Sequence, residues 1–141
     1  FTLLISSNFV LRIFMKNHDL GLLFIRLGLG ICLFFHGFAK ILNGVGGVKT
    51  IIAKSGLPEI LAYGAYIGEV LAPLMIIIGF YSRFAAGIII ASSVFILYVA
   101  YPNLLETLSH GGLRAEILYL YIASALCVVL SGSGKYAVKQ D

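Results

Sequence analysis

The sequence has little charge. Asp, Glu, Lys and Arg make up only 11% of its 141 residues, whereas hydrophobic residues make up 60%. An ordinary soluble domain is about one quarter charged. A chain as short and apolar as this one cannot bury its apolar surface in a small core and still cover itself with charge, which excludes an ordinary soluble fold. A lipid bilayer removes the difficulty, so the composition indicates an integral membrane protein.

Other features that the sequence lacks exclude whole classes of function. The formal net charge is +4, but no basic run is interleaved with aromatic residues, so the charge indicates membrane anchoring and no nucleic-acid binding. The GVGG stretch at 44–47 follows no strand and lacks the GK[ST] ending of a phosphate-binding loop. The three histidines have no metal-ligand spacing, and Cys32 and Cys127 form no CxxC pair. We expect no metal site and interpret both cysteines as packing residues.

Four apolar segments approach the length of about 20 residues that a spanning helix needs. They cover residues 20–42, 59–80, 84–101 and 114–132. Breaks that contain Gly, Pro or charged residues separate them at 43–58, 81–83 and 102–113. Backbone groups in hydrocarbon must be hydrogen-bonded within the chain, so each segment should be helical. The sequence therefore predicts an all-α fold, a four-helix transmembrane bundle with up-down topology and both termini on one face.

The first fourteen residues, FTLLISSNFVLRIF, are apolar but too short to add a span, and they lack the small-residue cleavage site of a signal peptide. Three interpretations stay open: an interfacial helix, an extension upstream of a true start at Met15, or residues that are not native. We favour a short helix along the membrane surface. Residues 1–15 then form an N-terminal extension, and residues 16–141 form the membrane domain. A slight excess of Lys and Arg on the terminal side favours cytoplasmic termini.

Three basic side chains occupy the first span, RLGLGICLFFHGFAKIL. Arg26, His36 and Lys40 lie within about 80° of one another on a helix of 3.6 residues per turn. A charge at mid-bilayer costs at least ~2.5–3.5 kcal/mol, so we expect this face to point into the bundle. In the same span Gly28, Gly30 and Gly37 are expected to permit close approach of a neighbouring helix.

Two acidic residues are the expected counterparts. Glu69 lies near the middle of the second span, in depth between His36 and Arg26, and could reach towards either of them. Glu116 lies near the start of the fourth span, at the depth of Lys40. The simplest arrangement is a polar shaft from the non-terminal face to the middle of the bundle, with Glu116 beside Lys40. Structural alternatives stay open, because Lys40 and Arg26 could extend to the headgroups and Glu69 could form a purely structural ion pair. Pro73, one turn after Glu69, is expected to disturb the helix there.

Three stretches carry a resemblance to the DoxX family of small four-helix membrane proteins: DLGLLFIRLGLGICLFFHGFAKILNGVGGV, SGLPEILAYGAYIGEVLAPLMIIIGFYSRFAA and GGLRAEILYLYIASALCVVLSGSGKYAV. The likeness covers about residues 19–138 and leaves out the first fourteen. It implies that Arg26, His36, Lys40, Glu69 and Glu116 occupy the polar positions of the family. We treat these five residues as candidates for ligand binding or proton relay, and no catalytic residue is assigned.

The namesakes of the family resemble small subunits of a terminal quinol oxidase or a thiosulfate:quinone oxidoreductase. The resemblance thus implies a subunit of a quinone-linked redox system in the bacterial inner membrane, with a quinone as the expected ligand. The sequence has no haem-ligand histidine pair and no flavin fingerprint, so a partner redox protein would supply electrons, and enzymatic activity of the chain itself stays open. Two alternatives also stay open: a non-catalytic scaffold or assembly subunit, and a small solute or proton permease, which would need to form a homo-oligomer.

Overall fold

The computed structural model describes the backbone of residues 2–141 and the side chains of residues 6–14 and 17–141. Over this range the secondary structure is helical, apart from an isolated bridge between Thr107 and Leu113. The all-α class is therefore confirmed. The elements are α1 (Thr2–Asn43), α2 (Gly46–Lys54), the 3-10 helix η1 (Glu59–Tyr63), α3 (Gly64–Tyr66), the π-helical turn η2 (Ile67–Leu71), α4 (Ala72–Ile78), α5 (Ser82–Ala100) and α6 (Glu116–Ser131).

Three helical stretches of the described chain are long and apolar enough to cross a membrane: Ser6–Asn43, Glu59–Ile78 and Ser82–Ala100. They overlap the first three predicted spans, although the first begins well before residue 20. The breaks predicted at 43–58 and 81–83 lie between them, and the first of these contains the short helix α2, which the sequence did not predict. The fourth predicted span corresponds to α6, whose 16 residues are fewer than the roughly 20 that a full crossing needs. The fold therefore has three helices of spanning length and a fourth, shorter apolar helix.

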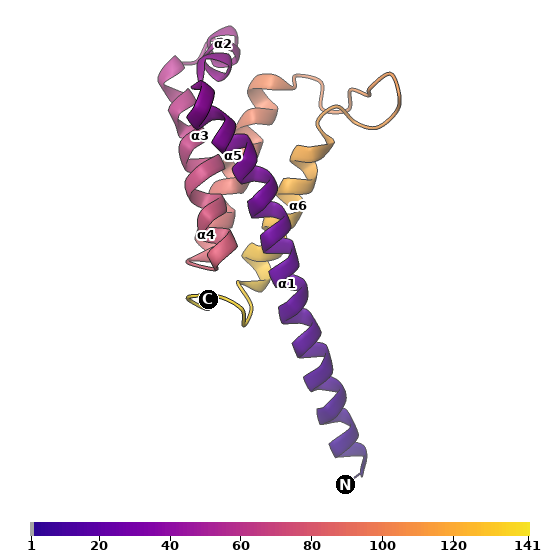
Figure 1. Cartoon of the computed structure of the whole chain (residues 1–141). Coiled ribbons are helices and arrows are strands. Elements are labelled where there is room, and N and C mark those ends of the chain that lie inside the picture. The colour runs from indigo at the N-terminus through magenta and orange to yellow at the C-terminus, as the bar shows by residue number, and fades with distance from the viewer. Residues whose placement is uncertain (1) are drawn as a thin grey trace.

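Helix α1 is one continuous helix of 42 residues and projects well beyond the other helices at its N-terminal end (Figure 1). At 1.5 Å per residue it is about 60 Å long, twice the roughly 30 Å of a bilayer core. Helix α1 has no break near residue 15, so residues 2–15 belong to the same helix as the first predicted span. Phe1 lies outside the described residues, and an interfacial position for the extension stays a prediction.

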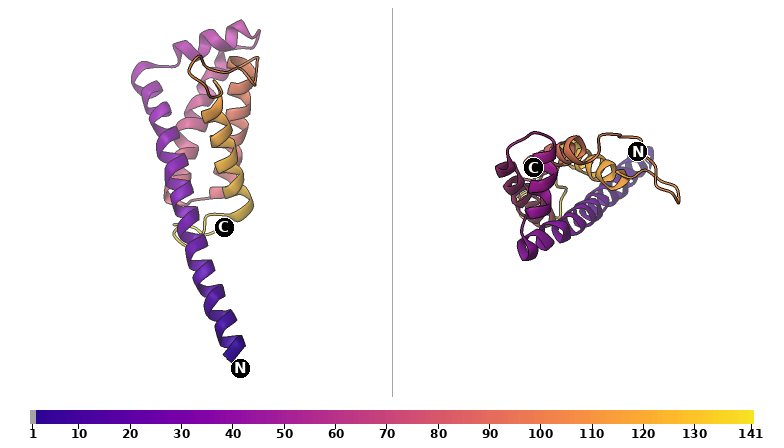
Figure 2. Two further views of the ribbon diagram at one scale, coloured as in Figure 1. Left: turned by 90° about the vertical axis from the view of Figure 1, so that its right-hand side faces the viewer. Right: turned by 90° about the horizontal axis from the view of Figure 1, so that it is seen from above.

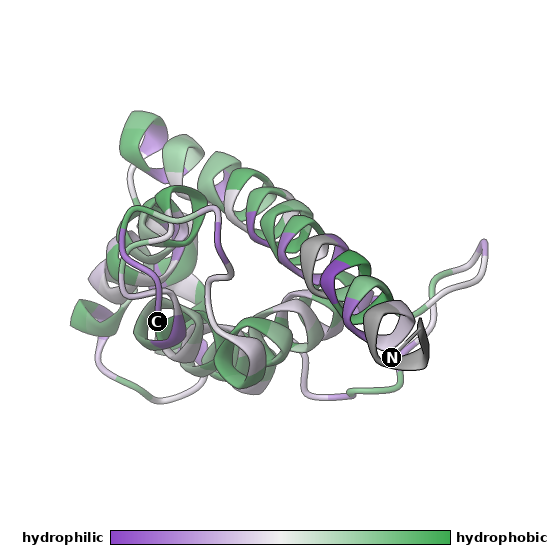
Figure 3. Ribbon diagram, turned by 90° about the horizontal axis from the view of Figure 1, so that it is seen from below, coloured by the Kyte–Doolittle hydropathy of each residue, from purple (hydrophilic) through white to green (hydrophobic). Residues whose placement is uncertain are grey.

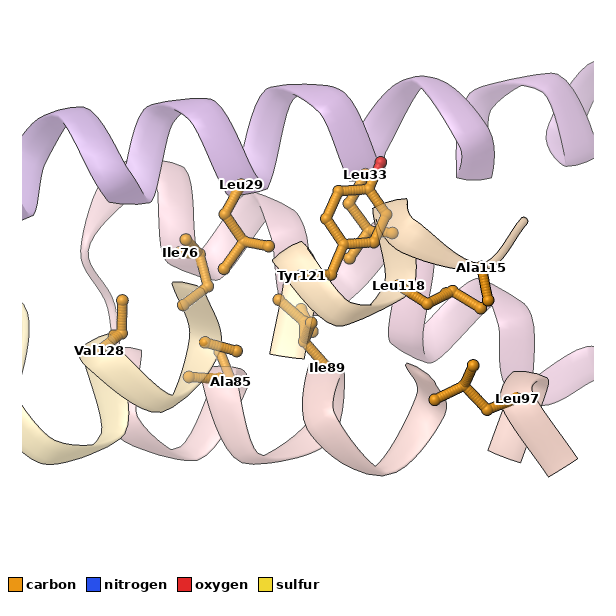
Figure 4. Packing of buried hydrophobic residues seen from close by; sticks show 13 residues of the cluster. Leu29, Leu33, Ile76, Ala85, Ile89, Leu97, Ala115, Leu118, Tyr121 and Val128 are labelled. Carbon is orange, nitrogen blue, oxygen red and sulfur yellow. The ribbon is translucent and has the colours of Figure 1, made fainter. Parts of the chain in front are cut away.

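The bundle is built from α1, the η2–α4 stretch, α5 and α6, which pack side by side (Figures 1 and 2). Leu29 and Leu33 of α1, Ile76 of α4, Ile89 of α5 and Val128 of α6 meet in its core (Figure 4). Apolar residues also cover the outer faces of the helices (Figure 3). Because many large apolar side chains are exposed on these faces, the surface is suited to contact with lipid.

Helix α2 lies across the end of the bundle away from the termini (Figure 2). Gly44 and Gly56, on either side of α2, have φ of 78° and 76°. Both angles lie in the left-handed region that glycine adopts without steric cost, so the chain can turn sharply into and out of this helix. Ile52 of α2 is fully buried and packs with Val45 and Ala62. Helix α2 therefore closes this end of the bundle by apolar packing.

Close packing between α1 and the second apolar stretch depends on two of the three glycines that the sequence indicated. A Cβ atom at Gly37 would lie 2.6 Å from the carbonyl carbon of Glu69, and one at Gly30 would lie 3.0 Å from the carbonyl oxygen of Pro73. The expectation is confirmed at these positions and is wrong at Gly28, where a Cβ would meet nothing within 4 Å.

Residues 132–141, which we call the C-terminal cap, fold back onto the turn between α4 and α5. The backbone N–H groups of Val138 and Lys139 donate to the carbonyls of Ile78 and Gly79 at 3.1 and 3.0 Å. The Asp141 carboxylate accepts hydrogen bonds from the backbone N–H groups of Arg83 and Ser133. Burial alone would raise the pKa of Asp141, but these hydrogen bonds and the nearby Arg83 charge outweigh it, so the pKa is lowered.

Candidate ligand site in the bundle

An ion pair joins α1 to η2. Lys40, in the last turn of α1, donates from its Nζ to Oε2 of Glu69. The Glu69 side chain is 5% exposed and that of Lys40 is 22% exposed, so the ion pair is largely buried. The Tyr66 hydroxyl donates to the backbone carbonyl of Lys40 at 3.2 Å and holds the end of α1 in place. The predicted partner of Lys40, Glu116, is therefore wrong.

The backbone around Glu69 departs from α-helical geometry. Residues Ile67–Leu71 form a π-helical turn in which the N–H of Ala72 donates to the carbonyl of Ile67, five residues earlier. The next residue, Pro73, has no N–H to donate, so the regular hydrogen-bond ladder cannot continue through this point. The expected disturbance beside Glu69 is thus confirmed. Such turns occur frequently at functional sites.

A cavity of about 550 Å³ lies beside the ion pair, in the half of the bundle near α2. This volume falls within the range of roughly 300–1,000 Å³ that is typical of small-molecule sites. Its walls come from α1, α2, the stretch from η1 to η2, α5 and α6, and most of them are apolar. The polar side chains on the walls are His36, Lys40, Glu69, Ser92, Ser93, Tyr101 and Tyr121. An apolar cavity with a few polar groups thus takes the place of the predicted polar shaft.

His36 and Tyr121 meet on the wall of this cavity. The ring of His36 lies edge-on to that of Tyr121, with centroids 6.3 Å apart and planes at 79°. Tyr121, on α6, is buried, whereas His36, on α1, is exposed although it lines the cavity. Within the described residues neither side chain takes part in a hydrogen bond. Their polar atoms are therefore available to a ligand.

Arg26 lies outside the cavity, in the half of the bundle near the C-terminal cap. Its side chain is fully buried, as expected for an inward-facing residue. The guanidinium donates to the carbonyls of Ile76 and Ile77 in the last turn of α4, at 3.0 and 3.1 Å. It also donates to the carbonyls of Ser133 and Tyr136 in the C-terminal cap, at 2.8 and 2.6 Å. Arg26 thus holds α1, α4 and the cap together.

Glu116 is also separate from the cavity. It is the exposed first residue of α6 and makes no ion pair within the part of the chain that the structure describes. Of the five candidates, the structure brings Lys40, Glu69 and His36 together at one cavity, and it places Arg26 and Glu116 elsewhere.

A comparison with family models finds one match: the DoxX model matches residues 21–102, which is more than half of the chain. The chain belongs to the DoxX family. No curated protein and no solved structure matches it in the two other comparisons. Family membership and the apolar helices together identify this DoxX chain as a small membrane protein.

The DoxX match contains Arg26, His36, Lys40 and Glu69 but ends before Glu116. It is therefore shorter than the resemblance to residue 138 that the sequence indicated. Helix α6 and the C-terminal cap lie entirely outside the matched region, although both contact residues within it. The cavity thus combines matched residues of α1 and η2 with Tyr121 from the unmatched part.

Sequence analysis missed Tyr121, Ser92 and Ser93. A signal for Tyr121 exists, because it is one helical turn from Leu118 and Ala125 and all three lie on the buried face of α6. Ser93 similarly lies four residues from Ile89 and from Leu97 on the buried face of α5. A polar side chain on an otherwise apolar inner face could have been detected by this periodicity.

Proposed function

We propose that this DoxX protein is a small integral membrane subunit of a quinone-linked redox system, and that its cavity binds the quinone headgroup. The supporting observation is the composition of the cavity: apolar walls, one ion pair, and two polar side chains, His36 and Tyr121, that form no hydrogen bond with the described residues. A quinone ring carries two carbonyl oxygens that accept hydrogen bonds, and its long apolar tail is suited to apolar walls and lipid. The chemistry of the donor groups fits these requirements.

Each polar residue of the cavity has a definite task in this proposal. Lys40 and His36 donate hydrogen bonds to carbonyl oxygens of the headgroup. Glu69 accepts a proton at Oε2 or passes one on, and its ion pair with Lys40 holds the carboxylate beside the headgroup. Leu33 and Leu118 exclude water from the headgroup. The quinone supplies two-electron, two-proton redox chemistry, and a partner redox protein supplies the electrons.

We also propose a membrane topology for the chain. Helix α1, the stretch from η1 to α4, α5 and the shorter α6 each span the bacterial inner membrane in up-down order, and both ends of the chain face the cytoplasm. Helix α6 packs along the length of α5, and tilting or local thinning of the bilayer accommodates its shorter length. Thiol labelling of Lys49→Cys and Lys139→Cys variants in intact cells tests this, after Cys32 and Cys127 have been replaced by Ser. Only Lys49→Cys should react with an impermeant reagent.

The ligand proposal is tested by purifying the full chain from membranes and measuring the quinone that copurifies, by solvent extraction and mass spectrometry. Wild type should contain quinone. Ala91→Phe should contain much less, because Ala91 lines the cavity from an exposed position on α5 and the larger ring fills the space without disturbing the core. Glu116→Gln is the matched control outside the cavity and should match wild type. Wild type that neither retains quinone nor binds an added short-tailed quinone would refute the proposal.

A scaffold function is the second candidate, favoured by one specific observation. The Lys40–Glu69 pair joins α1 to η2, and Arg26 joins α1 to α4 and the cap. The buried charges therefore also stabilise the packing of the helices against one another. In a scaffold, replacing both members of the pair by leucine should leave partner assembly intact, since matched apolar residues often replace a buried pair without loss of stability. In a quinone-binding subunit the same double variant should assemble but bind no quinone.

A further inference from the structure

Tyr121 lines the cavity, and no other residue that the structure describes forms a hydrogen bond with its hydroxyl group. The residue is only 6% exposed, and its hydroxyl points towards α1 (Figure 4). Buried tyrosine hydroxyls usually have a hydrogen-bond partner, yet this one has none among the described residues. Because Tyr121 also lines the cavity, the missing partner is best supplied by a bound molecule.

The surroundings of Tyr121 limit what that molecule can be. His36 lies edge-on to the ring, and Glu69 lines the same cavity. Glu69 and Lys40 already neutralise each other. An anionic ligand would have to displace Glu69 from Lys40, and a cationic ligand would have to displace Lys40. Either exchange leaves a nearly buried charge without its partner, which is strongly unfavourable.

We propose that Tyr121 is a ligand-binding residue that donates a hydrogen bond to a carbonyl oxygen, and that the cavity selects neutral amphiphiles over charged ones. This inference rests on the proposed function of the cavity and deepens it by naming the class of ligand: an uncharged headgroup with hydrogen-bond acceptors on an apolar tail. Lys40 of α1 and Tyr121 of α6 then contact the headgroup from two different helices.

The test compares three probes with the same ten-carbon tail: decyl-substituted benzoquinone, decanoate and decylamine. Binding to the full chain in lipid nanodiscs is measured by calorimetry, with empty nanodiscs as the blank. Wild type should bind the quinone at least about tenfold more tightly than either charged probe. Tyr121→Phe should weaken quinone binding by about 3- to 10-fold, as expected for the loss of one hydrogen bond, and should leave the melting temperature unchanged because no protein hydrogen bond is removed.

Tyr119→Phe is the matched control, since the Tyr119 hydroxyl donates to the carbonyl of Leu104 at 2.6 Å and does not line the cavity. It should leave quinone affinity unchanged. Quinone binding that Ala91→Phe abolishes and Tyr121→Phe leaves intact would overturn the role of Tyr121 while the function of the cavity stands. Tighter binding of decanoate would overturn the selection by charge. A lowered melting temperature in Tyr121→Phe would assign the hydroxyl a structural role instead, and no binding by wild type would overturn the proposed function itself.

Discussion

Replacing Gly37 by alanine should separate the two helices that carry the ion pair. A Cβ atom at Gly37 would lie 2.6 Å from both the carbonyl carbon of Glu69 and Cγ2 of Val70, and closer still to the carbonyl oxygen. Ordinary close contacts between a carbon and a carbonyl oxygen are about 3.3–3.6 Å. Because the obstacle is backbone, it cannot rotate away as a side chain would. Helix α1 must therefore move away from η2.

Two effects of opposite sign set the magnitude. Alanine is favoured over glycine inside a helix by about 0.5–1 kcal/mol. Overpacking a well-packed contact typically costs about 1–3 kcal/mol, and a clash with backbone belongs at the upper end. We expect Gly37→Ala to lose about 1–2 kcal/mol of stability overall. The movement should also lengthen the contact between Lys40 and Glu69, so quinone binding should fall with stability.

Two other glycines of α1 supply the controls. A Cβ at Gly28 would meet nothing within 4 Å, so Gly28→Ala should equal or exceed wild-type stability. At Gly30 the nearest atom, 2.6 Å away, belongs to the side chain of Ile77, which can move, so Gly30→Ala should fall between the other two. Thermal unfolding of the detergent-purified variants gives the order. Equal melting temperatures for Gly28→Ala and Gly37→Ala would refute the close approach of α1 and η2.

Three further variants test the buried charges and the cap. Glu69→Gln leaves Lys40 without its anion and should cost about 3–5 kcal/mol, seen as a lower melting temperature; an unchanged melting temperature together with wild-type quinone content would rule out both a structural and a proton-handling role. Arg26→Lys keeps the charge but cannot reach all four carbonyls, so we expect a loss of at least about 2 kcal/mol, and wild-type stability would contradict the fastening role. The lowered pKa of Asp141 means that its contribution is present above the ordinary value of 3.8 and is lost as the pH falls below that value towards the folded-state pKa. Asp141→Asn should therefore unfold with less dependence on pH in this acidic range, and identical pH profiles would contradict the hydrogen bonds assigned to the carboxylate.

The sequence by itself determined the helical class, the approximate positions of the apolar helices and the need of Glu69 for a partner. These follow from local rules: apolar backbone in lipid must be helical, Gly, Pro and charged residues interrupt such helices, and an acidic residue in the middle of an apolar stretch needs a compensating partner. Asn43 and Ile78 end their helices close to the predicted limits. The inward direction of Arg26 followed in the same way from the cost of its charge.

Only the tertiary structure decided which groups meet. Helix periodicity places Arg26, His36 and Lys40 on one face, but the rotation and crossing of neighbouring helices depend on contacts such as that of Gly37 with Glu69. Depth alone favoured Glu116 as the partner of Lys40. The structure selects Glu69, because the close approach of α1 to η2 brings its carboxylate within reach. Likewise, the guanidinium of Arg26 donates to carbonyls that are available only where α4 ends and where the C-terminal cap folds back. The cap residues lie more than a hundred positions after Arg26 in the chain, so helix periodicity could not have predicted this contact.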